Sequence, residues 1–454
     1  MFKKVLIANR GEIAARVART CKRLGLDTVA IYSEVDADGV HCQACDESVL
    51  IGPADARSSY LNVAAILAAA DATGADVIHP GYGMLSESPE FAQAVRDAGV
   101  SFVGLSPELM LKLLDRVQSR EIAINAGVRV IDGSERAVEN AADAAPFAEQ
   151  LGYPLAVKAV RGGGGLGPTM VREDSELAGA IERVQKRAQE LFGDGRVYLE
   201  KTLSRPRHVE VQVVADSHGD IVIVGDRECS IQRNGLRLLD ESPAPALLGS
   251  ERAERIRESV FDGAQRFARE AGFVGAGAVE FLIDSRGEAY FLEMRPRLQV
   301  AHGISEMCAN VDLVEAQMVI AHGGPVPAEI KKAIPSGHAM EVRITAEQVN
   351  RGFAPATGVV SEVRWPNASP GRLRIEASIQ PGSKVTTDYD TMVAKVITFA
   401  PTRHAALLLL DRVLAESAIV PLPTNSSFLR RILGHESFRA GQYDITFVEQ
   451  LLRK

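Results

Sequence analysis

The first 32 residues of the chain combine two apolar strand-like segments with a helical segment between them. Residues 3–8 and 26–32 predict buried strands, and residues 11–24 have the small and apolar spacing of a helix. Two strands joined by a helix within about 30 residues form a βαβ unit, which requires parallel strands and a helical crossover. A helix over residues 64–71 and a strand over residues 76–79 continue the pattern. The chain is therefore expected to begin with a parallel α/β domain.

Polar turns follow two of these strands. Residues 9–12 (Asn-Arg-Gly-Glu) follow the first strand, and residues 80–83 (Pro-Gly-Tyr-Gly) follow the strand over residues 76–79. In open α/β sheets, ligands bind outside the carboxyl ends of the strands. The first turn lacks the G-x-G-x-x-G spacing of a dinucleotide site, which argues against a nicotinamide cofactor.

From about residue 115 the pattern changes to an α+β arrangement with alternating, antiparallel strands. A Gly-Gly-Pro breaker at residues 323–325 separates a third segment from the second. In the second segment we expect a helix at 116–126 and strands at 128–131, 155–159, 200–203, 208–214, 221–226, 277–283 and 288–293. In the third we expect strands at 338–345 and 392–399 and a helix at 403–417. The fold class is therefore α/β followed by α+β.

Composition and charge exclude several classes of protein. With 454 residues, 46% of them hydrophobic and 24% charged, the chain suits a globular protein of about three domains. A net charge of −8 without a dense basic block argues against a nucleic-acid or anionic-membrane surface. Five scattered cysteines do not form a disulfide framework, and charged residues interrupt the most apolar late stretch, 404–422. We expect a cytoplasmic protein with neither a nucleic-acid nor a membrane partner.

A glycine-rich loop follows the strand predicted over residues 155–159. Lys158 lies near the end of that strand, and five glycines, including Gly163, Gly164 and Gly165, occupy the six positions 162–167. Backbone amides of such a loop can surround a phosphate, and the lysine adds a point charge. The order of residues does not match the P-loop motif, and a merely flexible turn is the alternative.

A hairpin predicted over residues 280–293 brings two carboxylates together. With Arg286-Gly287 at its tip, Glu280 pairs directly with Glu293. Directly opposed side chains have Cβ atoms about 4.5–5.5 Å apart, so the two carboxylates repel each other unless a cation lies between them. Mg²⁺ is the natural candidate. The alternative is a pair of solvated carboxylates, which the neighbouring phenylalanines disfavour.

Beyond Glu293 the strand pattern continues as Met-Arg-Pro-Arg-Leu-Gln-Val over residues 294–300. Side chains alternate with period two, so Arg295, Arg297 and Gln299 are expected on the same face as Glu293. This cationic strip suits a small oxyanion such as bicarbonate, a carboxylate or phosphate. The alternative is that one or both arginines pair with acidic neighbours.

These motifs, in this order, resemble the biotin carboxylases, a family of ATP-grasp enzymes, over nearly the whole chain. The similar segments include residues 7–14, 79–87, 158–167, 207–212, 227–233, 242–245, 337–343 and 388–392. The resemblance implies an N-terminal α/β domain (1–114), an ATP-grasp domain (115–325) with a glycine-loop lid at about 131–203, and a C-terminal α+β domain (326–454).

The resemblance also implies an activity, cofactors and partners. In the family, ATP and Mg²⁺ (or Mn²⁺) activate bicarbonate as carboxyphosphate, and the resulting CO₂ carboxylates biotin. Family carriers present biotin on a lysine in a Met-Lys-Met motif, and none of the nine methionines here precedes a lysine. We therefore expect biotin on a separate carrier protein, together with a carboxyltransferase and a homodimeric assembly.

Site residues are carried over position by position. The residues matching the ATP site are Arg116, Lys158, Gly163, Gly164, Gly165, Glu200, Lys201, His208, Gln232 and Arg237, with Glu200 and Lys201 at the adenine edge and His208 and Gln232 on the ribose side. Glu280 and Glu293 match the Mg²⁺ ligands. Arg297, Gln299 and the Val300 backbone match the bicarbonate site, and Arg343 matches the arginine at the biotin ureido oxygen. Arg295 lies on the same face.

The departures from the family fall where the chemistry takes place. The family glutamate that acts as a base on bicarbonate is Ala301, and a methyl group cannot accept a proton. The family asparagine after the second metal ligand is Arg295. Two phosphate-binding lysines are Arg116 and Arg237, which keep the charge but not the shape.

Further departures are Leu166 and Pro168 in the glycine loop, and Gly235 and Leu236 beside Arg237. Three functions remain open at this stage. One is a working biotin carboxylase. The second is an ATP-grasp ligase that activates bicarbonate or another carboxylate for a different nitrogen nucleophile. The third is a nucleotide-binding pseudoenzyme.

Overall fold

A computed structural model describes residues 2–162, 167–367 and 371–453. Its N-terminal region is a five-stranded parallel sheet of order β3-β2-β1-β4-β5, which confirms the predicted parallel domain. The strands are β1 (Lys4–Ile7), β2 (Asp27–Ser33), β3 (Glu47–Gly52), β4 (Val77–His79) and β5 (Ser101–Phe102), with helices α1 (Gly11–Arg23), α2 (Val40–Ala44), α3 (Val63–Thr73), α4 (Pro89–Asp97) and α5 (Pro107–Leu114).

The turns after β1 and β4 lie side by side at the carboxyl edge of this sheet. Asn9 donates from Nδ2 to the carbonyl oxygens of Pro80 (2.7 Å) and Tyr82 (2.8 Å). A buried amide with two backbone acceptors fixes the turns relative to one another. The chain after Tyr82 then leads to Glu87, which contacts Arg295 and Arg297.

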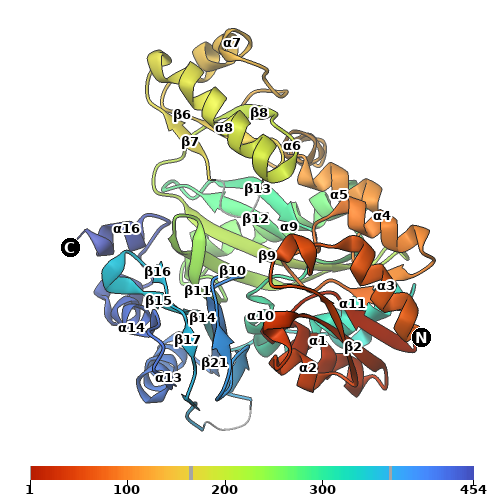
Figure 1. Cartoon of the computed structure of the whole chain (residues 1–454). Helices are drawn as coiled ribbons and strands as arrows, with labels where there is room; N and C mark the ends of the chain where they lie inside the picture. The colour runs from red at the N-terminus through yellow and green to blue at the C-terminus, as the bar shows by residue number, and fades with distance from the viewer. Residues whose placement is uncertain (1, 163–166, 368–370, 454) are drawn as a thin grey trace.

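The centre of the molecule is an eight-stranded sheet of order β13-β12-β9-β10-β11-β14-β21-β19 (Figure 1). Its strands come from both the second and the third predicted segments, and every neighbouring pair is antiparallel. They are β9 (Arg207–Ala215), β10 (Ile221–Arg233), β11 (Leu236–Ser242), β12 (Gly275–Ile283), β13 (Ala289–Arg295), β14 (His338–Thr345), β19 (Leu373–Ala377) and β21 (Met392–Ala400).

A small unit projects from one end of the molecule, at the top of Figure 1. Its sheet has the order β7-β6-β8, and two helices pack on it. The elements are α7 (Ala141–Leu151), β6 (Leu155–Ala159), β7 (Thr169–Val171), α8 (Leu177–Phe192) and β8 (Val197–Lys201). Helix α6 (Arg116–Asn125) leads into it, with its first turn capped by the Asp115 side chain.

The remaining helices cover the sheets. Helix α9 (Glu251–Glu270) packs its apolar face on the central sheet through Val260 and Phe267. The others are α10 (His302–Ala309), α11 (Leu313–Ala321), α12 (Ala328–Lys331), α13 (Arg403–Glu416), α14 (Ser426–Gly434), α15 (Glu436–Arg439) and α16 (Phe447–Leu452), and short strands are β15 (Glu347–Gln348), β16 (Ala354–Pro355), β17 (Gly358–Val359), β18 (Glu362–Arg364), β20 (Lys384–Val385) and β22 (Ala418–Val420).

Three expected strands differ from the structure. The strand expected at 221–226 is β10, which continues to Arg233. Residues 128–131 form no strand; only Val130 makes an isolated bridge, to Phe291. The strand expected at 200–203 is β8, which begins at Val197 and ends at Lys201. Residues 128–131 and strand β8 pair with segments far away in the sequence, Phe291 and β6 respectively. The local alternation of apolar residues therefore could not place them correctly. In the described part of the chain, no helix has the length and apolar character needed to cross a membrane.

Candidate active site

The hairpin β12–β13 pairs Glu280 with Glu293, as predicted, but by a different register. Near the tip the partners are Ile283 with Ala289, and Asp284 accepts the turn hydrogen bond from Gly287 with its carbonyl oxygen. Farther from the tip, Phe281 pairs with Phe291 and the next pair is Glu280 with Glu293, so the register shifts by one residue between these two pairs. The bulge compensates for the longer turn and leaves the two carboxylates opposite each other.

All four oxygens of these two carboxylates have an N–H neighbour. Glu280 Oε1 accepts a hydrogen bond from Arg237 NH2 (2.7 Å), and Glu280 Oε2 lies 2.9 Å from His208 Nε2. Glu293 Oε1 accepts a hydrogen bond from Arg295 NH2 (2.5 Å), and Glu293 Oε2 accepts one from Arg116 NH2 (3.2 Å). Two opposed carboxylates are the right chemistry for Mg²⁺, but the Arg295 guanidinium contacts both of them and lies where a bridging cation would bind, so this arrangement does not fit a protein-bound cation.

The charges around Glu280 determine its protonation. Burial disfavours the ionised form, but Arg237 and His208 outweigh burial and hold the pKa of Glu280 well below its usual value. Burial also opposes the charge of Arg295, whereas Glu293, Glu280 and Glu87 raise its pKa. Glu280 is therefore ionised and Arg295 protonated within this network.

The cationic strip is shorter than predicted. Strand β13 ends at Arg295, and residues 296–299 do not continue it, so the alternation expected over residues 293–299 is wrong beyond Arg295. The proline at position 296 removes a ladder hydrogen bond, which is a physical reason for the strand to end here. Arg295 and Arg297 still converge, because both face Glu87, at 3.8 and 3.4 Å.

Arg297 and Val300 line a cavity of about 370 Å³ beside this network. Arg237, Arg343 and Tyr82 line the same cavity. The Val300 carbonyl oxygen accepts from Lys395 Nζ (3.0 Å), which fixes the backbone at that position. Gln299 is buried, and its Nε2 has no hydrogen-bond partner. The predicted oxyanion and biotin-side residues are thus brought together, with Gln299 next to them in the chain.

Arg343 reaches the cavity from strand β14. It donates to Asp240 Oδ2 (3.0 Å) on β11, and its buried Nε has no hydrogen-bond partner in the described structure. A guanidinium held at one side by a buried carboxylate keeps its other N–H groups oriented. Asp240 therefore positions Arg343.

The phosphate-side residues meet where the projecting unit joins the central sheet. Lys158 on β6 forms an ion pair with Glu200 on β8, and Arg120 contacts the other Glu200 oxygen at 3.3 Å. Arg116 donates to the Ala159 carbonyl oxygen (3.4 Å) as well as to Glu293. A Cβ at Gly162 would lie 2.8 Å from Arg116 NH1, so a side chain there would crowd that guanidinium. Gly163, Gly164, Gly165 and Leu166 lie outside the described residues.

Two predicted residues sit differently from the rest. The Lys201 ammonium group donates to the carbonyl oxygens of Leu151 and Gly152, both at 2.9 Å, at the end of α7. Gln232 pairs with Arg237 across β10 and β11, which places it beside the network. Lys201 is thus fixed to the projecting unit, whereas Gln232 belongs to the central sheet.

Ala301 is fully buried in a small apolar cluster with Ile304, Cys308, Ala339 and Ile397. The cluster lies between helix α10 and strands β14 and β21. A methyl group suits these apolar neighbours.

Sequence reasoning missed two acidic side chains that organise the site. Glu87 joins Arg295 to Arg297, and Glu210 joins Arg237 (2.8 Å) to Arg227 (2.5 Å). Glu87 follows β4 at the carboxyl edge of the sheet, which is a signal that could have identified it. Glu210 lies two residues after His208 on β9, so the period-two rule places both side chains on the same face of the strand.

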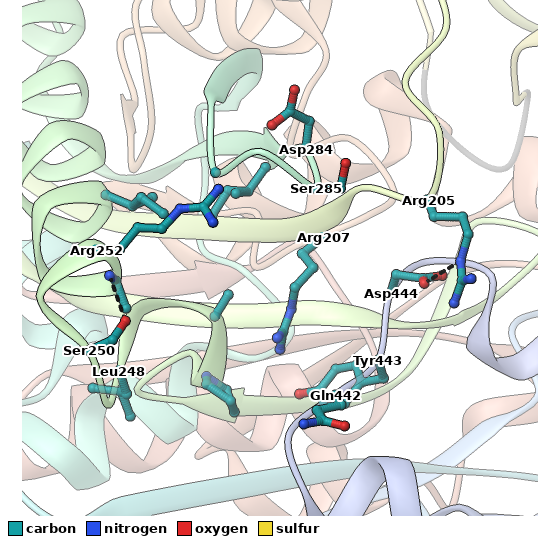
Figure 2. Close-up of a pocket in the computed structure, with 16 residues that line it drawn as sticks. Arg205, Arg207, Leu248, Ser250, Arg252, Asp284, Ser285, Gln442, Tyr443 and Asp444 are labelled. Atoms are coloured by element: carbon teal, nitrogen blue, oxygen red, sulfur yellow. Dashed lines mark hydrogen bonds and ion pairs between the residues drawn. The ribbon is translucent and has the colours of Figure 1, made fainter.

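A second cavity, of about 580 Å³, lies elsewhere (Figure 2). It is lined by Arg205, Arg207 and Arg252, by the turn of the β12–β13 hairpin and by the segment around Tyr443. Figure 2 shows Arg205 paired with Asp444. Arg207 alternates with His208 along β9, so this cavity opens on the opposite face of the strand from the network. Among the predicted site residues that the structure describes, none lines this cavity.

Comparisons with known proteins agree with this arrangement. The N-terminal domain of biotin carboxylase matches residues 1–110, the ATP-binding domain of the carbamoyl-phosphate synthase L chain matches 115–329, and the biotin carboxylase C-terminal domain matches 341–450. The biotin carboxylase of Halalkalibacterium halodurans is 43% identical over 100% of this chain and 98% of its own. Biotin carboxylase 1 of Bacillus subtilis is 41% identical over 99% and 98%.

Solved structures extend the similarity to three dimensions. A biotin carboxylase from Campylobacter jejuni superposes with a TM-score of 0.93 at 37% identity, covering 99% of each chain. The biotin carboxylase domain of the Hydrogenobacter thermophilus 2-oxoglutarate carboxylase has a TM-score of 0.93 at 36% identity, covering 100% of this chain and 98% of its own; that domain was solved as a dimer with MgADP, ADP and bicarbonate.

Fold and site together define an ATP-grasp enzyme, with a small lid-like sheet above a large antiparallel sheet. Within that class, the chain belongs to the biotin carboxylase family.

Proposed function

We propose that this protein is an ATP-dependent ligase that activates bicarbonate as carboxyphosphate and transfers CO₂ to a ureido nitrogen of biotin. The observation that carries this proposal is the single cavity that collects Arg237, Arg297, Val300 and Arg343. Three guanidinium groups around one cavity suit a doubly anionic intermediate. The cavity adjoins the Arg116 and Lys158 cluster, where the phosphates of ATP would lie.

ATP and Mg²⁺ are the cofactors of the proposed reaction. Lys158 and Arg116 would bind the phosphates, with His208 and Gln232 on the ribose side and Glu200 near the adenine. Their positions at the junction of β6, β8 and the central sheet support these roles. Magnesium, when bound to the nucleotide, neutralises phosphate charge and lowers the repulsion against an attacking anion.

Bicarbonate would bind to Arg297, Gln299 and the Val300 backbone. Because Ala301 cannot accept a proton, the chain must promote ionisation of bicarbonate by charge instead of by a base. Arg297 and Arg295 supply that charge, and both are held in place by Glu87. The proton then passes to solvent in the open cavity.

Biotin would enter the same cavity on a carrier, with Arg343 donating to the ureido oxygen as electron density builds up there. Asp240 holds Arg343 for this role. We further propose a homodimer, a cytoplasmic location and a carboxyltransferase partner. The dimeric domain from the 2-oxoglutarate carboxylase supports the homodimer. We also propose the domain limits 1–114, 115–325 and 326–454.

A ligase for another nitrogen nucleophile is the second candidate, and the substitutions at positions 295 and 301 favour it. A pseudoenzyme is the third. Full-length similarity to proteins named biotin carboxylase favours the first function over both.

The test is phosphate release from Mg-ATP by the purified protein, measured alone, with bicarbonate, and with bicarbonate plus free biotin. Arg297→Ala removes a guanidinium from the cavity, and Arg286→Ala removes an exposed one at the hairpin tip as a matched control. We expect release that requires bicarbonate, rises with biotin, is lost in Arg297→Ala and is kept in Arg286→Ala. Calorimetric binding of ATP without any release would refute biotin carboxylation and favour the pseudoenzyme.

A further inference from the structure

The predicted metal site already contains a cation supplied by the protein. Arg295 lies between the two opposed carboxylates, with NH2 at 2.5 Å from Glu293 Oε1 and Nε at 3.6 Å from Glu280 Oε1. A third carboxylate, Glu87, lies 3.8 Å from Arg295 NH1. The guanidinium therefore has acidic partners on several sides, at the position where the sequence placed Mg²⁺.

The other oxygens of the pair are occupied as well. Arg237 donates to one Glu280 oxygen, and His208 Nε2 lies within hydrogen-bonding distance of the other. Arg116 donates to the second Glu293 oxygen. Each carboxylate oxygen can still accept a second contact, so the obstacle to Mg²⁺ is the Arg295 guanidinium between the two carboxylates. In the part of the chain that the structure describes, no three His, Cys, Asp or Glu side chains gather in a way that could hold a metal ion.

The charge balance also opposes a cation at this position. Three guanidinium groups, from Arg116, Arg237 and Arg295, already meet three carboxylates, those of Glu280, Glu293 and Glu87. The side chains of Glu280 and Arg295 are only 2% and 19% exposed. A divalent ion would add two positive charges to a partly buried site whose charges already balance. An arginine cannot relieve this repulsion by losing its proton.

We propose that Arg295 permanently replaces a protein-bound divalent cation between Glu280 and Glu293. The Glu280–Arg295–Glu293 bridge then keeps the hairpin carboxylates together and presents fixed positive charge to the nucleotide. Mg²⁺ reaches the site bound to the phosphates and takes no ligand from this carboxylate pair. The nucleotide part of this inference rests on the proposed function, whereas the binding of metal to the free protein does not.

The first experiment measures Mn²⁺ binding to the nucleotide-free protein by the loss of the free-ion EPR signal. At about 0.1 mM Mn²⁺, within the range in which carboxylate sites bind divalent cations, we expect no bound ion in the wild type. Arg295→Asn removes the guanidinium from the pair and should gain one site per chain. Arg297→Asn is the matched control, because it removes an arginine that contacts Glu87 but neither Glu280 nor Glu293, and it should gain none.

The second experiment measures ADP affinity by calorimetry, with Mg²⁺ and with EDTA. We expect the wild-type Kd to change by less than about threefold, and that of Arg295→Asn by about tenfold or more, because only the variant can bridge metal to protein. This measurement on the wild type keeps the inference testable if the variant does not fold.

Two results would overturn the inference. One is a stoichiometric Mn²⁺ site in the nucleotide-free wild type. The other is an ADP affinity of the wild type that collapses in EDTA, which would mean that Arg295 leaves the pair when metal arrives. Failure of the proposed function would look different: ADP would not bind under either condition, while the Mn²⁺ titration of the free protein would still report on Arg295.

Discussion

Glu210 offers a sharp test of how the buried charges hold the site together. Its side chain is fully buried on β9, with Oε1 at 2.5 Å from Arg227 Nε and Oε2 at 2.8 Å from Arg237 NH1. Arg227 is itself fully buried, and its other partners are the neutral Gln212 and Ser305. Glu210→Gln keeps the volume and removes the only negative charge among these partners of Arg227.

Two arguments give the size of the effect. Removing one partner of a buried ion pair costs about 3–5 kcal/mol, because the remaining charge is left uncompensated. Burial disfavours ionisation of Glu210, but Arg227 and Arg237 lower its pKa from 4.5 to about 2. That difference corresponds to about 3 kcal/mol of stability at neutral pH. We therefore expect Glu210→Gln to lower the free energy of unfolding by about 3–4 kcal/mol.

Urea denaturation at pH 7 measures the loss, and Glu108→Gln is the control. Glu108 pairs with Arg96 at 2.7 Å, but their side chains are 62% and 52% exposed, so water and salt screen the pair and little change is expected. Because the Glu210 pKa is depressed, its contribution is complete above pH 4.5 and disappears as the pH falls toward 2. Equal losses in the two variants, or a Glu210→Gln loss independent of pH, would refute the reasoning.

Three further changes test the region beneath the cavity. Burial raises the pKa of Glu341 to about 7, so between pH 4.5 and 7 the folded chain holds a proton that the unfolded chain has lost. The free energy of unfolding should therefore fall by about 3 kcal/mol as the pH rises through this window. Denaturation at several pH values measures this fall, and Glu341→Gln should abolish it. Lys395 is fully buried at 3.5 Å from Glu376, and although burial opposes ionisation of that carboxyl, Lys395 and the neighbouring arginines hold its pKa well below the usual value. Lys395→Met should therefore lower the free energy of unfolding by about 3–5 kcal/mol, and a negligible change would contradict an ionised Glu376. A methyl group at Gly303 would meet the Ile397 side chain, so Gly303→Ala should cost about 1–3 kcal/mol by overpacking, and an unchanged melting temperature would contradict the observed packing.

Local sequence was sufficient for much of the fold. The βαβ start needed only the apolar periods of residues 3–32, because a short crossover admits one handedness and a parallel pair. The Glu280–Glu293 pair was also predictable, since a hairpin relates residues a few positions apart. Even there the turn and the compensating bulge escaped prediction, because bulges depend on packing across the sheet.

Neighbours far apart in sequence decided what the site can do. Arg116 reaches Glu293 from 177 positions away, and Arg237 reaches Glu280 from 43. From the sequence we predict a cation between the two carboxylates, with the pairing of an arginine to an acidic neighbour as the alternative for the strip that follows. The tertiary structure shows that pairing for Arg295. Periodicity predicts which face a side chain takes, but only the packing of distant strands determines which charge lies opposite it.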